Sequence, residues 1–236
     1  MVITWYGHAC FGISNGVRIV TDPYTPEVAK LSPVPDEADI VIMSSDDDVY
    51  HSDAASVPGS PEVLNALTIA REGGSRVAGR VRFDAIEARE SIVHKAQPDF
   101  NAMYAFTVDG IRIAHMGDIG NALTAEQIDF LRGTDVLLAL TGGPVTIDLA
   151  DLDTVIDAVQ PRIVIPMHYK IPNLPLNIFD LEAFTSRFPA EMVEVRSETA
   201  LALTHDRLPE RMRIVALQPL ANAPEYPAPG AAPWTI

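Results

Sequence analysis

A predicted helix followed by a wholly apolar strand, in the second half of the chain, limits the folds that this sequence can adopt. Ile163–Met167 is a continuous apolar run, as expected for a strand covered on both faces. Pro161 separates it from a segment, residues 149–159, whose apolar residues recur at helical spacing: Leu149, Leu152, Val155, Ile156 and Val159. A buried strand next to an amphipathic helix indicates a layered α/β protein.

Hairpins dominate the first half. Val2–Tyr6, Phe11–Ser14 and Val17–Thr21 have strand character, and Asn15-Gly16 is a strong signal for a two-residue turn. Asp109-Gly110 predicts a second hairpin. We therefore expect two sheets with helices outside, in one domain over residues 1–218, followed by a Pro/Ala-rich tail over 219–236 that lacks periodicity.

Three local patterns give finer expectations. Residues 23–37 contain four prolines, which predicts a connection without a helix. Ser60-Pro61-Glu62 predicts a helix start, with the helix over Val63–Ala70. Thr124-Ala125-Glu126-Gln127 matches the capping box and predicts a helix to about Leu131.

Charge and cysteine content narrow the classes of function. The net charge is −15, which argues against nucleic acid and against anionic membranes as partners. Cys10 is the only cysteine, and the first residues resemble a strand rather than a signal peptide, so we expect a cytoplasmic protein. No apolar run approaches the roughly 20 residues that a membrane span requires.

Candidate site residues gather at predicted strand ends. The strand Asp39–Met43 leads into an acidic loop, residues 44–53, which ends near His51. His115 and Asp118 end another strand, and His168 ends a third. Because metal sites are commonly built from residues that converge at one sheet edge, these strand ends are candidates for a metal site, although strand ends alone are a weak signal. His8, in a Gly-His-Ala turn, could orient that site or cap the turn.

Four segments carry a resemblance to a known family. They are Trp5–Phe11, Thr21-Asp22-Pro23, Ala114–Gly120 and Val164–Lys170. Together they resemble the metallo-β-lactamase superfamily, most closely its bacterial metal-dependent hydrolases related to ascorbate-6-phosphate lactonase, over residues 2–172. The resemblance implies a four-layer αββα sandwich and hydrolysis at a metal site that usually binds two zinc ions.

The family signature, His-x-His-x-Asp-His, is degenerate here. Aligned without a gap, it falls on Ser45, Asp47, Val49 and Tyr50, which could not hold the usual metals. With one inserted residue it falls on Asp46, Asp48, Tyr50 and His51, and this register also fits Gly59-Ser60-Pro61 better, so we prefer it. The family's middle histidine falls on Glu90, whereas Asp118 and His168 stand in their family places.

The resemblance therefore implies an oxygen-rich ligand set: Asp46, Asp48, His51, Glu90, Asp118 and His168. Such a set suits Mn, Mg, Fe or Zn. Because Tyr50 replaces the aspartate that usually binds the second metal, we expect a single ion. Asp118 and Tyr50 are the expected catalytic residues, with Asp118 steering the attacking water. His8, Asp22, His115 and Lys170 are expected to support the site.

Two functions follow from this pattern. The first is a hydrolase that cleaves an ester, lactone or phosphoester of a small molecule with the help of the altered metal site. The alternative is a non-catalytic protein of the same fold that has lost its metals and acts in binding or scaffolding. Neither the substrate nor the oligomeric state follows from the sequence, and an oligomer is compatible with it.

Overall fold

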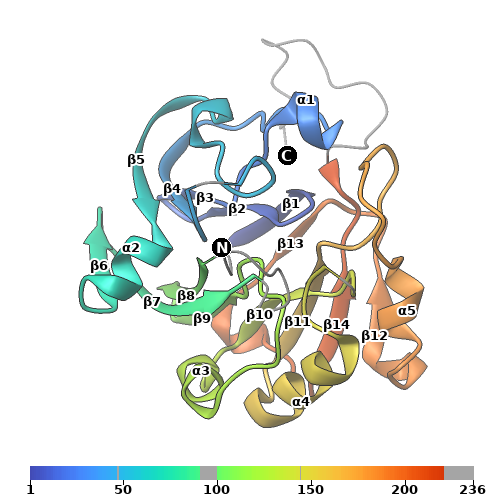
Figure 1. The fold of residues 1–236 in the computed structure, drawn as a ribbon. Coiled ribbons are helices and arrows are strands. Elements are labelled where there is room, and N and C mark those ends of the chain that lie inside the picture. The colour runs from blue at the N-terminus through green and yellow to red at the C-terminus, as the bar shows by residue number, and fades with distance from the viewer. Residues whose placement is uncertain (47, 91–99, 144, 221–236) are drawn as a thin grey trace.

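Two stacked β-sheets form the centre of the protein. The computed structural model describes residues 1–46, 48–90, 100–143 and 145–220. Within that part, one sheet has six strands in the order β13-β1-β2-β3-β4-β5 and the other has eight in the order β12-β14-β11-β10-β9-β8-β7-β6. The predicted sandwich of two sheets is confirmed, and Figure 1 shows the sheets face to face.

The strands of the six-stranded sheet are β1 (Val2–Gly7), β2 (Cys10–Ser14), β3 (Arg18–Thr21), β4 (Ala38–Met43), β5 (Gly59–Asn65) and β13 (Ala200–Ala202). The eight-stranded sheet comprises β6 (Ser75–Ala78), β7 (Val81–Arg89), β8 (Phe100–Val108), β9 (Ile111–His115), β10 (Val136–Leu140), β11 (Ile163–Met167), β12 (Val193–Val195) and β14 (Arg213–Ala216). One hydrophobic core joins the two sheets, with Trp5, Phe83 and Phe106 among its fully buried side chains.

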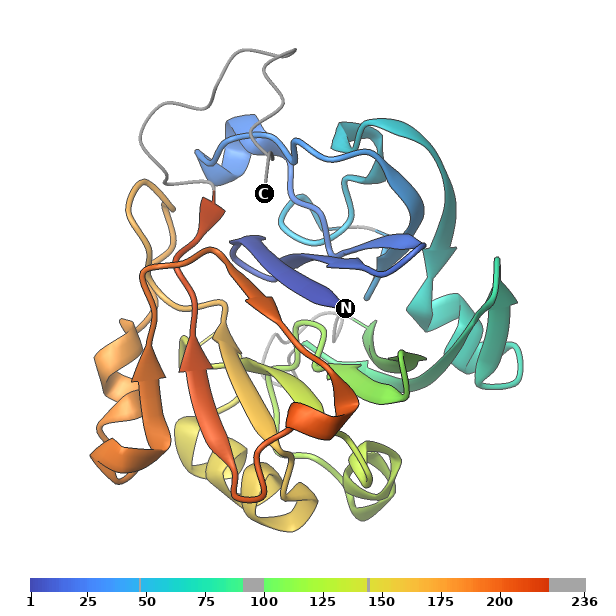
Figure 2. The ribbon, with the colours of Figure 1, turned by 180° about the vertical axis from the view of Figure 1, so that it is seen from behind.

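Helices lie on the outside of the sandwich. Figures 1 and 2 show α3 (Ala125–Leu131), α4 (Leu149–Val159) and α5 (Leu181–Thr185) outside the eight-stranded sheet, and α1 (Pro26–Ala29) on the side of the six-stranded sheet. α3 has the predicted capping box, in which Thr124 and Gln127 bond reciprocally. The apolar stripe of α4 is buried as predicted. No helix of the described residues is long and apolar enough to cross a membrane.

Two local predictions were wrong. The proline-rich connection contains the short helix α1, because Pro26 occupies the first turn, where a proline lacks no needed hydrogen bond. The helix expected over Val63–Ala70 is instead the end of strand β5 followed by α2 (Ala66–Arg71). Val63 and Leu64 pair with Val41 and Ile42 of β4, and Asn65 caps α2 through its side chain, so sheet pairing overrides the proline signal.

Strand direction decides where the polar residues gather. β3, β4 and β5 are parallel neighbours, and so are β9, β10 and β11 in the other sheet. The loops that leave β3, β4, β9 and β11 carry Asp22, His51, Asp118 and His168. Parallel strand ends that meet at one edge commonly form a ligand site.

Candidate metal centre

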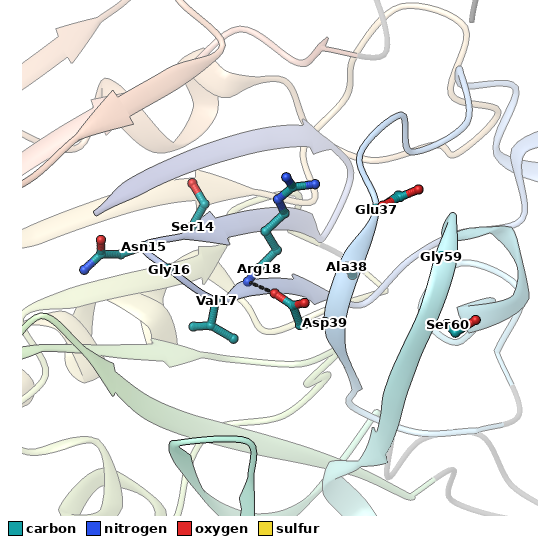
Figure 3. A pocket seen from close by; sticks show the side chains of 10 residues that line it. All are labelled: Ser14, Asn15, Gly16, Val17, Arg18, Glu37, Ala38, Asp39, Gly59 and Ser60. Carbon is teal, nitrogen blue, oxygen red and sulfur yellow. Dashed lines mark hydrogen bonds between the residues drawn. The ribbon is translucent and has the colours of Figure 1, made fainter. Parts of the chain in front are cut away.

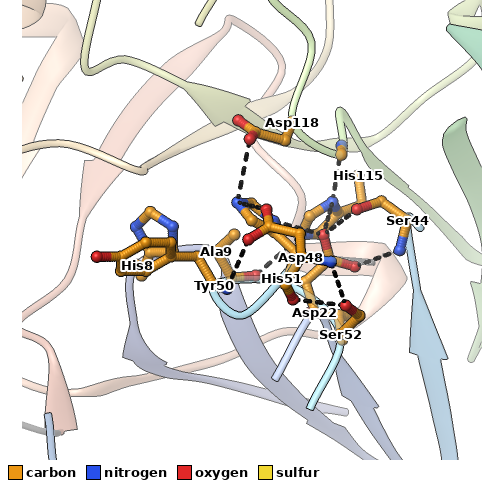
Figure 4. A network of polar contacts seen from close by, with 12 residues as sticks. His8, Ala9, Asp22, Ser44, Asp48, Tyr50, His51, Ser52, His115 and Asp118 are labelled. Carbon is orange, nitrogen blue, oxygen red and sulfur yellow. Dashed lines mark hydrogen bonds and ion pairs between the residues drawn. The ribbon is translucent and has the colours of Figure 1, made fainter. Parts of the chain in front are cut away.

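Buried histidines and carboxylates converge at this edge (Figure 4). Two groups of side chains place one possible ligand atom each within 4.8 Å of one another: His8, His51 and His168, and Asp48, His51 and Asp118. His51 belongs to both groups, and all three histidines are buried. The five residues come from four segments that are distant in sequence, so the fold itself assembles the cluster.

Asp22 holds His51 in place. Its Oδ2 accepts a hydrogen bond from His51 Nδ1 at 2.9 Å, which turns Nε2 of His51 toward Asp118. The same carboxylate accepts bonds from the Ser44 backbone N–H, the Ser44 hydroxyl and the Tyr104 hydroxyl. Asp22 itself adopts a left-handed backbone conformation with φ of 38°. A strained, fully hydrogen-bonded aspartate of this kind is typical of a site that fixes a neighbouring ligand.

Asp118 lies between two histidines. Its Oδ2 is 3.5 Å from His51 Nε2, and its Oδ1 is 3.3 Å from His168 Nε2. The Asp118 side chain also hydrogen-bonds with that of Glu90. Asp48 approaches the same point, with Oδ2 at 3.9 Å from His51 Nε2. The carboxylates of Asp118 and Asp48 therefore both face Nε2 of the His51 imidazole.

The carboxylates near His51 favour a positive charge at this place. Burial disfavours an imidazolium at position 51, but Asp118, Asp22 and Asp48 outweigh it and raise the pKa of His51 to about 10. Burial and the charge of His51 together lower the pKa of His168 to about 3. Burial, followed by the neighbouring histidines, also lowers the pKa of His8 well below its usual value. Within the described residues, no lysine or arginine forms an ion pair with Asp22, Asp48 or Asp118.

Comparison with known proteins identifies the family. The model of the beta-lactamase superfamily domain matches residues 2–168. The chain belongs to the metallo-β-lactamase superfamily. Its relatives include a UPF0173 metal-dependent hydrolase of Thermoplasma acidophilum, 28% identical over 207 residues that cover 80% of this chain and 89% of the relative. A UPF0173 protein of Pyrococcus abyssi is 29% identical over 183 residues, which cover 72% and 83% of the two chains.

Solved structures of the superfamily share the fold. A superfamily protein from Thermotoga maritima has a TM-score of 0.71 and 29% identity, with 92% of this chain and 97% of that chain covered. A metallo hydrolase from Ignicoccus hospitalis has a TM-score of 0.55 and 20% identity, with 75% and 86% covered. The second likeness concerns the fold alone.

The metallo-β-lactamase signature can now be placed in space. Asp48 and His51 face Asp118, and Tyr50 is half-buried with its ring centroid 5.6 Å from that of His8. Asp46 is exposed and outside both groups. In the alignment without a gap, the signature falls instead on Ser45, Asp47 and Val49, besides Tyr50. Of these, Val49 is 48% exposed, Ser45 is buried, and Asp47 lies outside the described residues.

Of the remaining predicted residues, some lie near the cluster and one lies on the surface. Glu90 reaches Asp118, and His115 is buried, with Nδ1 at 4.0 Å from Asp22. Lys170 is exposed, in contrast to the buried histidines of the two groups. Within the described residues the structure therefore places nine predicted residues in the two groups that share His51 or beside them, and leaves Asp46 and Lys170 on the surface.

Sequence reasoning missed three supporting residues. Tyr104 donates to Asp22 Oδ1 at 2.8 Å, Asn101 Oδ1 accepts from the Asp118 backbone N–H at 3.1 Å, and Ser44 donates to Asp22. Asn101 and Tyr104 lie in β8, which carries no motif of its own. The available signal was Asn101, an amide side chain in a strand of mostly apolar residues.

A glycine positions His168. A Cβ on Gly142 would lie 2.0 Å from the carbonyl oxygen of His168, so this strand end admits only glycine. We expect Gly142→Ala to lower the free energy of unfolding by about 1–3 kcal/mol, since the backbone must shift. It should also weaken metal binding by displacing His168. Denaturant titration and metal titration measure the two effects.

Gly133→Ala is the control for this variant. Gly133 has open space around its Cβ position but a φ of 76°, so alanine there should cost about 1 kcal/mol of strain without moving His168. Equal metal affinity of the two variants would show that Gly142 does not position the ligand.

A separate hollow lies at the other end of the six-stranded sheet (Figure 3). It measures about 690 Å³ and is lined by the β2–β3 turn and by the first residues of β4 and β5. Arg18 donates its backbone N–H to Asp39 there. The hollow therefore lies at the opposite strand ends from the candidate centre, and its lining groups include no histidine.

Proposed function

We propose that the protein is a metal-dependent hydrolase of a small-molecule ester, lactone or phosphoester. The observation that carries this proposal is a set of buried polar atoms at the candidate centre that have no hydrogen-bond partner among the described residues: His51 Nε2, Asp118 Oδ1, His168 Nδ1 and both ring nitrogens of His8. Buried polar atoms are normally paired, and such a gathering is explained by an ion that they bind. The naming of its relatives as metal-dependent hydrolases supports the same activity.

The residues fit a divalent metal. Asp48, His51, Asp118 and His168 would hold it, with Glu90 bonded to Asp118. Imidazole and carboxylate donors together suit Zn, Mn or Fe, and carboxylates alone would also accept Mg. We expect one ion rather than two, because Asp46 is exposed and outside both ligand groups, and Tyr50 stands where the signature has aspartate.

The bound metal would polarise a carbonyl or phosphoryl oxygen and lower the pKa of water, as in other metal-dependent hydrolases. The protein residues supply orientation. Asp118, whose two oxygens lie near His51 Nε2 and His168 Nε2, steers the attacking water. Asp22 fixes the ring of His51 through Nδ1. Tyr50, half-buried beside His8, contacts the substrate at the edge of the site.

Metal content is the decisive test. Protein purified without added metal, and then incubated with Mn²⁺ or Zn²⁺ and desalted, should retain close to one equivalent of metal by plasma mass spectrometry. The loaded protein should then hydrolyse at least one member of a panel of esters, lactones and phosphoesters. Trace metal under every condition would contradict the proposal and favour the non-catalytic alternative.

A further inference from the structure

A purely structural role does not explain the burial of His8. It lies in the turn between β1 and β2, it is fully buried, and its φ is 52°. Neither ring nitrogen has a hydrogen-bond partner within the described residues. Burying two unpaired polar atoms is unfavourable, and a packed core histidine normally pairs at least one of them.

The His8 ring faces two other imidazoles. Its centroid is 4.0 Å from that of His168 and 4.9 Å from that of His51. One nitrogen of each of the three rings lies within 4.8 Å of the others. His51 has already used Nδ1 on Asp22, so Nε2 is the nitrogen it can offer. Three imidazoles that converge without hydrogen bonds among them leave room for a shared cation.

The backbone fixes His8 in this position. Its carbonyl oxygen accepts hydrogen bonds from the His168 backbone N–H and from Trp5 Nε1, each at 3.0 Å. The next carbonyl, that of Ala9, is bonded to His115 Nε2 at 2.9 Å. His168 shares the left-handed conformation, with φ of 54°. Both strained residues are thus tied to one another across the two sheets, which is typical of a functional site.

We propose that His8 is a third imidazole ligand of the metal, so that the centre consists of His8, His51 and His168 with the carboxylates of Asp118 and Asp48. This inference rests on the proposed metal-dependent function and adds a ligand from outside the signature loop. Three nitrogen donors shift the preference from Mg²⁺ toward Zn²⁺, Mn²⁺ or Fe²⁺. His8 thereby compensates for the imidazoles missing at Asp46 and Asp48.

Counting the imidazoles bound to Cu²⁺ tests this proposal directly. Cu²⁺-loaded protein gives electron spin echo modulations from the remote nitrogen of each coordinated imidazole, and we expect three in the wild type. His8→Asn should reduce the count to two. For His8→Asn, competition against a chelator should show that the Zn²⁺ affinity is lowered by at least about 10²-fold relative to the wild type. Loss of a residue that only supports a ligand lowers metal affinity by less than this.

The controls separate coordination from folding. Asparagine tolerates the left-handed conformation of position 8, so His8→Asn should keep a wild-type circular dichroism spectrum. His205→Asn, at an exposed histidine of the same chain, should change neither the count nor the affinity. If His8→Asn does not fold, the number of imidazoles bound to Cu²⁺ in the wild type is sufficient to test the proposal.

The outcomes also distinguish the two proposals. A wild-type count of two, or a His8→Asn variant with unchanged count and Zn²⁺ affinity, would overturn the role of His8 and leave the metal-dependent function standing. A wild type that binds neither Cu²⁺ nor Zn²⁺ would overturn both.

Discussion

Asp118→Ala should abolish metal-dependent hydrolysis, with a loss of about 10³-fold in kcat/KM. A metal ion supplies several kcal/mol of stabilisation to the transition state, and each 1.36 kcal/mol corresponds to a factor of ten. Asp118 lies 3.5 Å from His51 Nε2 and 3.3 Å from His168 Nε2, so its removal takes away the carboxylate that both histidines share. The measurement is the rate on whichever ester, lactone or phosphoester the wild type cleaves, together with the metal content.

The matched comparison for this variant is Asp46→Asn. Asp46 is exposed, although its position in the signature made it an expected ligand. We therefore expect Asp46→Asn to retain metal and activity within about twofold, since surface substitutions away from a site rarely matter. Hydrolysis by Asp118→Ala at the wild-type rate would contradict the proposed role of Asp118. Loss of metal in Asp46→Asn would show that the loop rearranges on binding to bring Asp46 inward.

Much of the fold was predictable because local signals agreed with the tertiary structure. The apolar run Ile163–Met167, the stripe of 149–159 and the capping box at Thr124 each predicted the observed element. The failure over Val63–Ala70 came from pairing that no local signal contains. Pro61 opens helices in many sequences, but here β4 offers a parallel partner for Val63 and Leu64.

The site was predictable to a smaller extent. Strand ends and the family resemblance indicated Asp48, His51, Asp118 and His168, and the structure places these four together. The sequence did not show which side chains of the acidic loop belong to the site. Asp46 and Asp48 are two residues apart in one acidic run, yet Asp48 belongs to the cluster whereas Asp46 is exposed. Nor could spacing show that a turn at residue 8 would meet His168 from the other sheet.

Asp22→Ala should be the most destabilising single change at the site, lowering the free energy of unfolding by about 3–5 kcal/mol. The Asp22 carboxylate is buried and accepts hydrogen bonds from His51, Tyr104 and, at two atoms, Ser44. Alanine would leave all of these donors unpaired in the core and would remain in an unfavourable backbone conformation. Urea titration followed by circular dichroism measures the loss.

Asp39→Ala provides the stability control. Asp39 also accepts a backbone N–H, that of Arg18, but on the surface. Water can replace this bond, so we expect a loss of at most about 1 kcal/mol. A loss at Asp22 no larger than that at Asp39 would show that the buried network contributes little to stability.

Asp22→Asn separates the structural role of this residue from its role toward the metal. Asparagine tolerates the φ of 38° and keeps Oδ1 as the acceptor for Tyr104 and the Ser44 backbone. Its amide nitrogen replaces Oδ2 and cannot accept from His51 Nδ1, so the ring loses the bond that directs Nε2 toward Asp118. We therefore expect a smaller stability loss than for alanine but Zn²⁺ affinity lowered by about 10–100-fold. Unchanged affinity in Asp22→Asn would mean that packing alone orients His51, because the protein would then bind the ion equally well without the carboxylate.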